Sequence, residues 1–456
     1  MKKLFSLFLL LIALPALVLG VKKVLDLRKG AAGKPANIVI DVSQTGGEIS
    51  QNLWQNFAQG GEEPKDMLAP AINEIKALNP KIIRIDHVFD FYVSVNGTDF
   101  DFSKLDKVVQ TILATGAVPM FSLSYTPAAM SRDGQLTSPP KDWSLWQKLI
   151  RETVSRYSGK NGLNLANVYY EVWNEPDLFG KWHYGKDPNY LVLYQQTVAA
   201  AQSVPNVNSF NIGGPATTGF YPNWLKAILK FCYENKLRMD FVSWHRYTEN
   251  LDDYEDDFEK LNRILTDYPE YFSLERLITE YGPDSENSPW YDTKVAAAHA
   301  IAGSIRLLGK VHRVFAFELK DGPDPQGQKF WGRWGLLTHE KTGLEKKPRY
   351  FAYQFLNKLF GKRLSLIGEG SWVAAAAAKD GKVVKVLIVN YDSADHHFET
   401  VPVTLKNVPA GNYSFKTSYF MGKETTVQEN LAGGDVVKNI FLEPNTVVML
   451  EWTKTN

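Results

Sequence analysis

Two glutamates stand in settings that suit acid–base and nucleophilic chemistry. Glu175 precedes Pro176 in a Trp-Asn-Glu-Pro run, and Glu280 follows an apolar run that ends at Thr279. Because each follows a short β-prone segment, we expect each at the C-terminal end of a buried strand. Glycoside hydrolysis uses two such groups: one carboxyl group transfers a proton, and a second attacks the anomeric carbon.

The chain from residue 45 to 360 alternates short apolar runs with amphipathic helical patterns, such as 143–157 and 190–202. This alternation is typical of βα units with a parallel sheet. Eight strands with crossover helices favour a closed (β/α)8 TIM barrel over an open sheet, and catalytic side chains gather at the C-terminal ends of such strands. The predicted strands are Leu53–Ala58, Ile82–Asp86, Val118–Ser122, Val168–Trp173, Phe210–Gly213, Phe241–Trp244, Arg276–Thr279 and Val314–Glu318. On this map Glu175 ends the fourth strand and Glu280 the seventh.

The character of the chain changes after residue 360. Residues 361–456 carry short strand-like runs separated by turn signals such as Lys379-Asp380-Gly381, without a helical pattern between them. We therefore predict an α/β protein in which an antiparallel β-sandwich accompanies the barrel. The earlier run 37–43 is also strand-like, and it could pair into that sandwich and join the two ends of the chain.

The N-terminus has the pattern of an export signal. Lys2 and Lys3 precede an apolar stretch that ends near Gly20, which predicts a signal peptide over residues 1–20 and a secreted or extracytoplasmic protein. Residues 21–36 read as a basic linker. The alternative is an N-terminal membrane anchor, because the cleavage site is imperfect; against it, the stretch is short for a membrane span and Pro15 interrupts it.

Composition excludes several classes of partner. Lys and Arg number 51 against 50 Asp and Glu, so neither nucleic acid nor an anionic membrane surface is indicated, and we expect an oligo- or polysaccharide substrate instead. Cys232 is the single cysteine and reads as a core residue. No cluster has the ligand spacing of a zinc or calcium site, so we expect neither metal nor cofactor. The oligomeric state is left open.

Three motifs together resemble glycoside hydrolase family 39, the β-xylosidase and α-L-iduronidase group, within the clan of retaining (β/α)8 glycosidases. They are YYEVWNEPDL at 169–178, SWHRY at 243–247 and ITEY at 278–281. The resemblance covers residues 50–360, and the family also carries a β-sandwich beside its barrel. It implies a double-displacement mechanism in which Glu175 is the acid/base and Glu280 the nucleophile, with carboxyl groups about 5–5.5 Å apart.

The resemblance also implies a set of substrate-binding residues. Asn174 would bind the sugar 2-OH, and His245 would line the subsite. Arg84 and Tyr247 would keep Glu280 ionised, so its pKa should fall while that of Glu175 rises. Arg84 has an alternative role, as the partner of the deeper carboxylate of Glu171.

Positions at strand ends and in loops on the catalytic side add further candidates. Glu318 ends the eighth strand, and Asp86 with His87 ends the second; each is either a substrate-binding residue or an ordinary rim residue. Trp334 lies in a loop on the same side, where an indole could stack on a sugar, as could Trp182 and Trp331; core packing is the alternative.

Three functions are compatible with these features. The first is a retaining exo-enzyme such as a β-xylosidase, and the second is an endo-acting hydrolase of a bacterial exopolysaccharide. The third is a non-catalytic carbohydrate-binding relative, which the presence of both glutamates disfavours. Lys181 and Arg246 could favour a uronate, so the identity of the sugar is left open.

Overall fold

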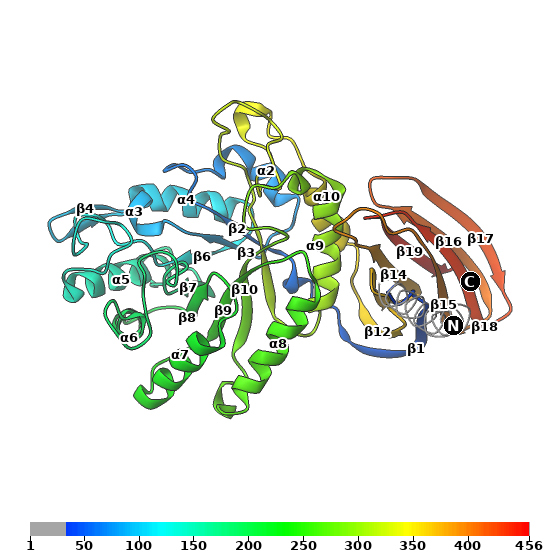
Figure 1. Ribbon diagram of the computed structural model, residues 1–456, viewed down its shortest axis with the longest axis horizontal. Helices are drawn as coiled ribbons and strands as arrows, with labels where there is room; N and C mark the ends of the chain where they lie inside the picture. Colours follow the sequence, from blue (N-terminus) through cyan, green and yellow to red (C-terminus); the bar gives the residue numbers. More distant parts are fainter. Residues whose placement is uncertain (1–32, 456) are drawn as a thin grey trace, which may run out of the picture.

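A computed structural model of the protein describes residues 33–455. The predicted signal peptide and residues 21–32 of the predicted linker lie outside the described residues. A barrel surrounded by helices and a large curled sheet lie side by side (Figure 1). Within the described part of the chain, no helix has the length and apolar character that a membrane span requires.

The barrel is closed by eight parallel strands in the order β10-β11-β2-β3-β6-β7-β8-β9, which confirms the predicted TIM barrel. The strands are β2 (Asn56–Gln59), β3 (Ile82–Ile85), β6 (Val118–Ser122), β7 (Val168–Glu171), β8 (Phe210–Thr217), β9 (Phe241–Tyr247), β10 (Glu275–Gly282) and β11 (Arg313–Phe317).

The start of the first predicted strand was wrong. Leu53 belongs to a 3-10 turn, η1 (Gln51–Leu53), and β2 begins only at Asn56. The Asn56 side chain donates hydrogen bonds to the carbonyls of Asn52 and Leu53, at 2.6 and 3.3 Å, and so closes that turn. Leu53 is apolar because it packs in the core, not because it extends a strand.

Alternation along the strands divides the barrel core into two layers. On β3, Ile83 and Ile85 pack outward against the helices, whereas Ile82 joins a separate cluster inside the barrel with side chains such as Met120 and Leu277. Since successive side chains of a strand point to opposite faces, Arg84 shares the interior face with Ile82. The alternation therefore brings the charged side chain of Arg84 into the barrel, beneath the strand ends.

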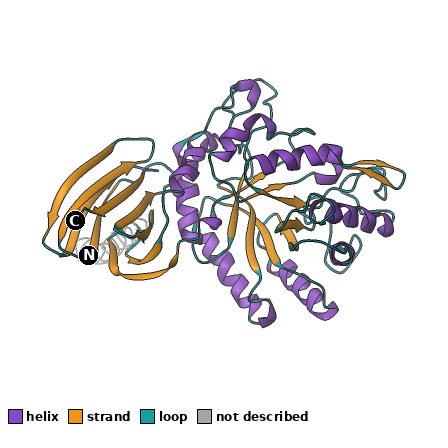
Figure 2. Cartoon of the chain, turned by 180° about the vertical axis from the view of Figure 1, so that it is seen from behind, coloured by secondary structure: helices purple, strands orange, loops and turns teal. Residues whose placement is uncertain are grey.

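Helices surround the barrel on its outer side (Figure 2). They are α2 (Ile72–Lys76), α3 (Val88–Tyr92), α4 (Ser103–Ala114), α5 (Trp143–Tyr157), α6 (Tyr190–Gln202), α7 (Pro222–Asn235), α8 (Asp252–Leu265), α9 (Lys294–Leu307) and α10 (Pro348–Leu356). Asp142, Asn189 and Thr293 cap α5, α6 and α9, because each side chain accepts a hydrogen bond from a backbone N–H in the first turn. Cys232 is buried in α7.

The second body is a nine-stranded, mostly antiparallel sheet in the order β17-β16-β19-β14-β13-β12-β1-β15-β18. Its edge strands β17 and β18 are consecutive in the chain, and an ion pair between Lys438 and Glu429 joins them. The sheet therefore curls over on itself and encloses one hydrophobic core. Its strands are β1 (Ile38–Glu48), β12 (Lys362–Ile367), β13 (Val373–Asp380), β14 (Val383–Asn390), β15 (Glu399–Val408), β16 (Gly411–Tyr419), β17 (Glu424–Leu431), β18 (Gly434–Leu442) and β19 (Val447–Lys454).

The early strand does pair into this sheet. β1 is antiparallel to β12 and parallel to β15, so the first described strand is held by the last part of the chain. Helix α9 lies between the sheet and the barrel (Figure 1) and is buried on almost all sides. The alanines of β13 at 374, 376 and 378 join the same core as α9, where small side chains allow close packing of helix and sheet.

Candidate active site

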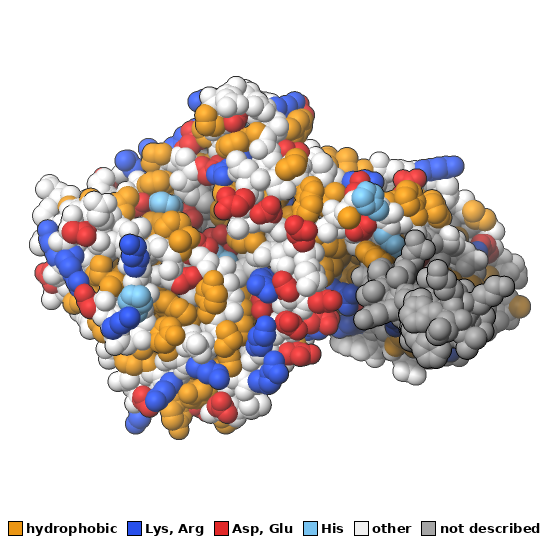
Figure 3. Space-filling view, viewed as in Figure 1, with side chains coloured by type: hydrophobic (Ala, Val, Ile, Leu, Met, Phe, Trp, Pro, Cys, Tyr) orange, Lys and Arg blue, Asp and Glu red, His pale blue; other side chains and the backbone are white. Residues whose placement is uncertain are grey.

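A cavity of about 890 Å³ opens at the C-terminal ends of the barrel strands. Acidic side chains gather beside a hollow on this face of the molecule (Figure 3). The charged residues of its lining are Glu62, Asp86, His87, Glu175, Asp177, Glu280, Glu286 and Arg333. Both glutamates that the sequence singles out therefore face one cavity.

Glu175 projects from a tight turn directly after β7. Trp173 and Glu175 have left-handed backbone conformations, with φ of 75° and 47°. Such conformations cost free energy in residues other than glycine and persist where the surroundings fix them. Here the Glu175 N–H donates to the carbonyl of Ala216 at 3.0 Å, which ties the turn to β8. The turn therefore directs the Glu175 side chain into the cavity.

Glu280 lies within β10, close to the cavity floor. The pairing of β10 with β9 shifts register between Ile278 and Glu280, where Glu280 comes opposite His245. Irregularities of this kind change the direction of a side chain and often occur beside active sites. Glu280 is only 6% exposed, so its carboxyl group reaches the cavity from a largely dry environment.

His245 connects the two glutamates. Its Nδ1 lies 2.8 Å from Glu175 Oε1 and 3.5 Å from Glu280 Oε2. The nearest atoms of the three side chains all lie within 4.8 Å of one another. Burial lowers the pKa of His245, which is fully enclosed, and so favours the neutral imidazole between the two carboxyl groups.

Arg84 is the centre of the hydrogen bonds beneath the cavity. Its guanidinium donates to Glu171 at 2.7 Å, to Glu280 at 3.0 Å and to the Asn174 side-chain oxygen at 2.6 Å. The predicted buried pair of Glu171 with an arginine is therefore confirmed, and the same arginine also holds Glu280. Asn174 in turn donates to the Tyr125 hydroxyl at 2.9 Å, so its amide orientation is fixed from both sides.

The predicted fall in the pKa of Glu280 was wrong. Burial raises the pKa of Glu280 to about 7, although His245 and Arg84 oppose the rise and Tyr247 donates a hydrogen bond at 2.8 Å. Burial also raises the pKa of Glu175 to about 8, with the charge of Asp177 as the next cause. The loss of hydration exceeds the stabilisation of the anion in both cases, and the hydrogen bonds from Arg84 and Tyr247 favour Glu280 as the ionised member of the pair.

The structure separates the other predicted site residues into two groups. Asn174, Tyr247 and Trp334 line the cavity. Arg84 and His245 are fully buried behind it and contact the glutamates.

Glu318 requires a correction. Its side chain is fully buried and does not line the cavity. It accepts hydrogen bonds from the Gln59 side chain at 2.7 Å and from the Gly60 N–H at 3.1 Å, and burial raises its pKa well above the usual value. Glu318 directly follows β11, the eighth strand, and these hydrogen bonds attach it to the end of β2 and the loop that follows it.

Of the three tryptophans considered for sugar stacking, two line the cavity and one is buried. Trp331 and Trp334 line the cavity, and Trp334 packs edge-on against Phe317 with ring centres 5.3 Å apart. Trp182 is instead 2% exposed and packs edge-on against Trp173, which removes it from the candidates for sugar stacking.

Several lining residues were not identified from the sequence. Tyr125 follows the end of β6, and its position at a strand end was the available signal. Phe179, Glu62 and Arg333 lie in long loops whose course no local pattern specifies. Arg246 does not line the cavity but pairs with Asp257 at 3.1 Å, so it gives no support for a uronate.

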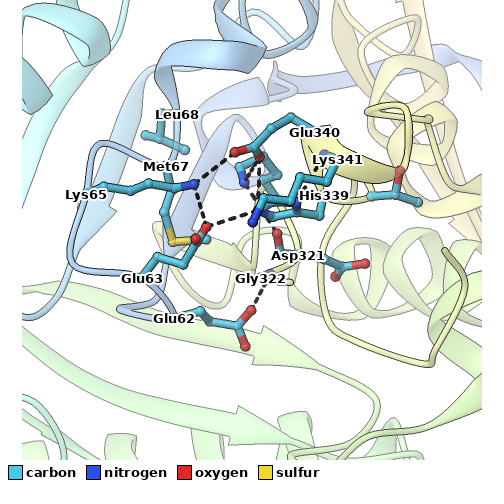
Figure 4. A network of polar contacts seen from close by, with 12 residues as sticks. Glu62, Glu63, Lys65, Met67, Leu68, Asp321, Gly322, His339, Glu340 and Lys341 are labelled. Atoms are coloured by element: carbon cyan, nitrogen blue, oxygen red, sulfur yellow. Dashed lines mark hydrogen bonds and ion pairs between the residues drawn. The ribbon is translucent and has the colours of Figure 1, made fainter. Parts of the chain in front are cut away.

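The wall of the cavity beside Glu62 is held by a polar network (Figure 4). Lys65, in the loop after β2, lies 3.0 Å from both Glu63 and Glu340, and His339 lies 3.0 Å from Glu63. The buried ammonium group of Lys320 lies 2.5 Å from Glu340. The network thus joins the loop after β2 to the segment after β11.

Two sets of side chains among the described residues are arranged closely enough to hold a metal ion. One is Glu63, His339 and Glu340, where the ammonium groups of Lys65 and Lys320 already compensate the carboxylates. The other is Glu175, His245 and Glu280, where Arg84 has that role.

Residues 83–411 match the sequence family described as glycosyl hydrolases family 39. The β-xylosidase of Geobacillus stearothermophilus is 28% identical over 320 residues, and that of Caldicellulosiruptor saccharolyticus is 27% identical over 339. These matches cover 63% and 68% of this chain, and 61% and 66% of the relatives.

Solved structures support the same fold. The GH39 enzyme of Xanthomonas axonopodis pv. citri superposes with a TM-score of 0.75 at 22% identity, over 92% of this chain and 98% of that one. A monomeric β-xylosidase of Caulobacter crescentus CB15 gives 0.75 at 21%, over 92% and 100%. Since the family match spans most of the barrel and continues into the sheet, the chain belongs to family 39 of the glycosyl hydrolases.

Proposed function

We propose that the protein is a secreted, retaining glycoside hydrolase that releases terminal sugars from oligo- or polysaccharides, with a β-xylosidase-like specificity. The observation that carries this proposal is the approach of Glu175 and Glu280, whose nearest oxygens lie within 4.8 Å across His245. An inverting enzyme needs carboxyl groups about 6.5–9.5 Å apart to admit a water between them. The closer spacing favours direct attack on the sugar.

In this mechanism the two carboxyl groups have opposite tasks. Glu175 donates its proton to the departing oxygen, while ionised Glu280 attacks the anomeric carbon and forms a covalent glycosyl ester. Glu175 then removes a proton from the water that hydrolyses the ester. Two successive inversions at the anomeric carbon leave its configuration retained.

The surrounding groups support these tasks. Hydrogen bonds from Arg84 and Tyr247 stabilise the carboxylate of Glu280 before attack and as it leaves the ester. Asn174, oriented by Arg84 and Tyr125, is placed to bind the sugar 2-OH, a contact that strengthens in the oxocarbenium-like transition state.

The charge of the cavity favours a neutral sugar over a uronate. Apart from the two catalytic candidates, its lining carries Glu62, Asp86, Asp177 and Glu286, and the guanidinium of Arg333 is paired with Glu62. The other basic residue of the described lining, His87, is paired with Asp90 at 2.7 Å, so a uronate would face this negative charge without an unpaired cation beside it. A neutral pentoside agrees with the β-xylosidases among the relatives.

Product analysis tests the proposal. We expect aryl β-xyloside to be the preferred substrate in a panel of aryl glycosides, and proton NMR to detect the β-anomer as the first-formed sugar. Xylo-oligosaccharides should yield xylose together with the substrate shortened by one unit in the early phase. An α-anomer formed first would contradict retention, and early release of longer fragments from an exopolysaccharide would favour the endo-acting alternative.

The pH dependence of kcat/KM should be a bell centred near neutral pH. Activity requires Glu280 ionised and Glu175 protonated. With pKa values of about 7 for Glu280 and about 8 for Glu175, activity rises as pH approaches 7 and falls above 8. The limbs belong to the coupled pair and not to single residues.

Removal of the neighbouring charge gives a control for this profile. In Asp177→Asn the alkaline limb should move to lower pH, because the charge of Asp177 raises the pKa of Glu175. A profile with both limbs below pH 5, measured with an aryl glycoside, would mean that the glutamates are not desolvated in the working enzyme.

A further inference from the structure

Asp86 is a buried carboxylate in the lining of the cavity. It directly follows β3 and is 7% exposed. Its Oδ1 has no hydrogen-bond partner among residues 33–455. Burying a carboxylate without donors costs several kcal/mol or shifts its pKa, and such groups are found where a ligand supplies the donors.

His87 extends the same surface and is held in one orientation. Its Nδ1 lies 2.7 Å from Asp90, whose other oxygen accepts the Tyr125 N–H at 3.1 Å. The ring stacks on Phe91, with centres 4.3 Å apart. Only a glycine fits at position 61, because a Cβ there would lie 2.2 Å from the His87 ring. Nε2 is therefore the ring nitrogen of His87 left for a ligand.

The order of the strands relates this pair to the substrate. The strands β7, β6, β3 and β2 are neighbours in the barrel, and their ends contribute Asn174, Tyr125, Asp86 and Gly60 to the lining in that order. Under the proposed function, the anomeric carbon lies between Glu280, which attacks it, and Glu175, which protonates the departing oxygen, and the 2-OH lies at Asn174. The next hydroxyls of the sugar ring then face the ends of β6 and β3.

We propose that Asp86, with His87 beside it, determines specificity for the terminal sugar by accepting hydrogen bonds from its 3-OH and 4-OH. This rests on the proposed function and deepens it. A carboxylate that requires both hydroxyls selects sugars that are unsubstituted there. A sugar linked through its 4-oxygen to another residue lacks one donor, so the pair selects chain ends over internal positions.

The test combines changes in the protein with changes in the substrate. The full chain, as wild type and Asp86→Asn, is assayed with an aryl β-xyloside and with its 3-deoxy and 4-deoxy analogues. For the wild type we expect each deoxy analogue to lose about 10²–10³-fold in kcat/KM, because a site built for hydroxyls leaves its buried group unpaired. For Asp86→Asn we expect a similar loss on the parent glycoside.

The decisive quantity is the coupling between the two changes. In Asp86→Asn at least one of the two deoxy analogues should lose no more than about threefold relative to the parent, because the amide has one accepting oxygen where the carboxylate has two. Asp257→Asn is the matched control: Asp257 is also buried, pairs with Arg246 and lies outside the cavity, so its variant should keep the full discrimination of the wild type.

Three results would overturn the proposal. The first is a wild-type enzyme whose kcat/KM for both deoxy analogues lies within about threefold of its value for the parent glycoside. This result can be obtained without any variant. The second is an Asp86→Asn enzyme that discriminates as strongly as the wild type, and the third is an equal loss of discrimination in Asp257→Asn. Failure of the proposed function is distinguishable, because the wild type would then hydrolyse none of the parent glycosides.

Discussion

Glu280→Ala is expected to abolish turnover of every glycoside that the wild type hydrolyses, with a loss on the order of 10⁵-fold in kcat, as for the removal of other catalytic nucleophiles. Neither Glu175, which is turned toward the leaving group, nor Glu171, which is fully buried in its pair with Arg84, can replace it. Steady-state rates on an activated aryl glycoside and on a xylo-oligosaccharide measure the effect, and both should fall together.

Glu275→Ala is the matched control on the same strand. Glu275 lies at the opposite end of β10, where it accepts a hydrogen bond from Tyr169 at 2.6 Å, away from the cavity. This variant should keep activity close to that of the wild type. Loss of a single proton-transfer group can leave about a hundredth of the wild-type rate. If Glu280→Ala retained more than that, Glu280 would not be the nucleophile.

Glu175→Ala is expected to separate substrates by their leaving groups. Proton donation contributes about 10²–10⁴-fold, so a xylo-oligosaccharide, whose leaving alkoxide needs the proton, should lose that factor. A dinitrophenyl glycoside leaves as a stable anion, and its first step should proceed at nearly the wild-type rate. Pre-steady-state release of dinitrophenol measures this step directly.

Azide provides the complementary result for Glu175→Ala. The small anion should occupy the space left by the side chain and attack the glycosyl ester without a general base, which restores turnover and yields a β-glycosyl azide. An absence of rescue on the dinitrophenyl glycoside, or an α-glycosyl azide as product, would mean that the roles of Glu175 and Glu280 are misassigned.

Most of the barrel could be predicted because its signals are local. The helices at 143–157 and 190–202 have the predicted bounds, since their apolar positions recur with the helical period and an Asp or Asn cap precedes each. The curled sheet was predicted less completely. The sequence predicts strands over 371–378, 383–390, 401–405, 412–420 and 446–452, so β12, β17 and β18 were missed. Strand β17 is exposed along most of its length, so its sequence has no apolar alternation that would reveal it.

The chemical groups of the site could be inferred from the sequence: two glutamates at strand ends, with an asparagine and a tyrosine in the motifs beside them. Residue type and position along a strand are local properties, and the closed barrel brings all strand ends to one face. Which groups reach the cavity depends on the tertiary fold, because burial is set by segments distant in the chain. The fold encloses Glu318 and Trp182, raises the pKa of Glu280 through loss of hydration, and leaves Oδ1 of Asp86 without a donor among the described residues.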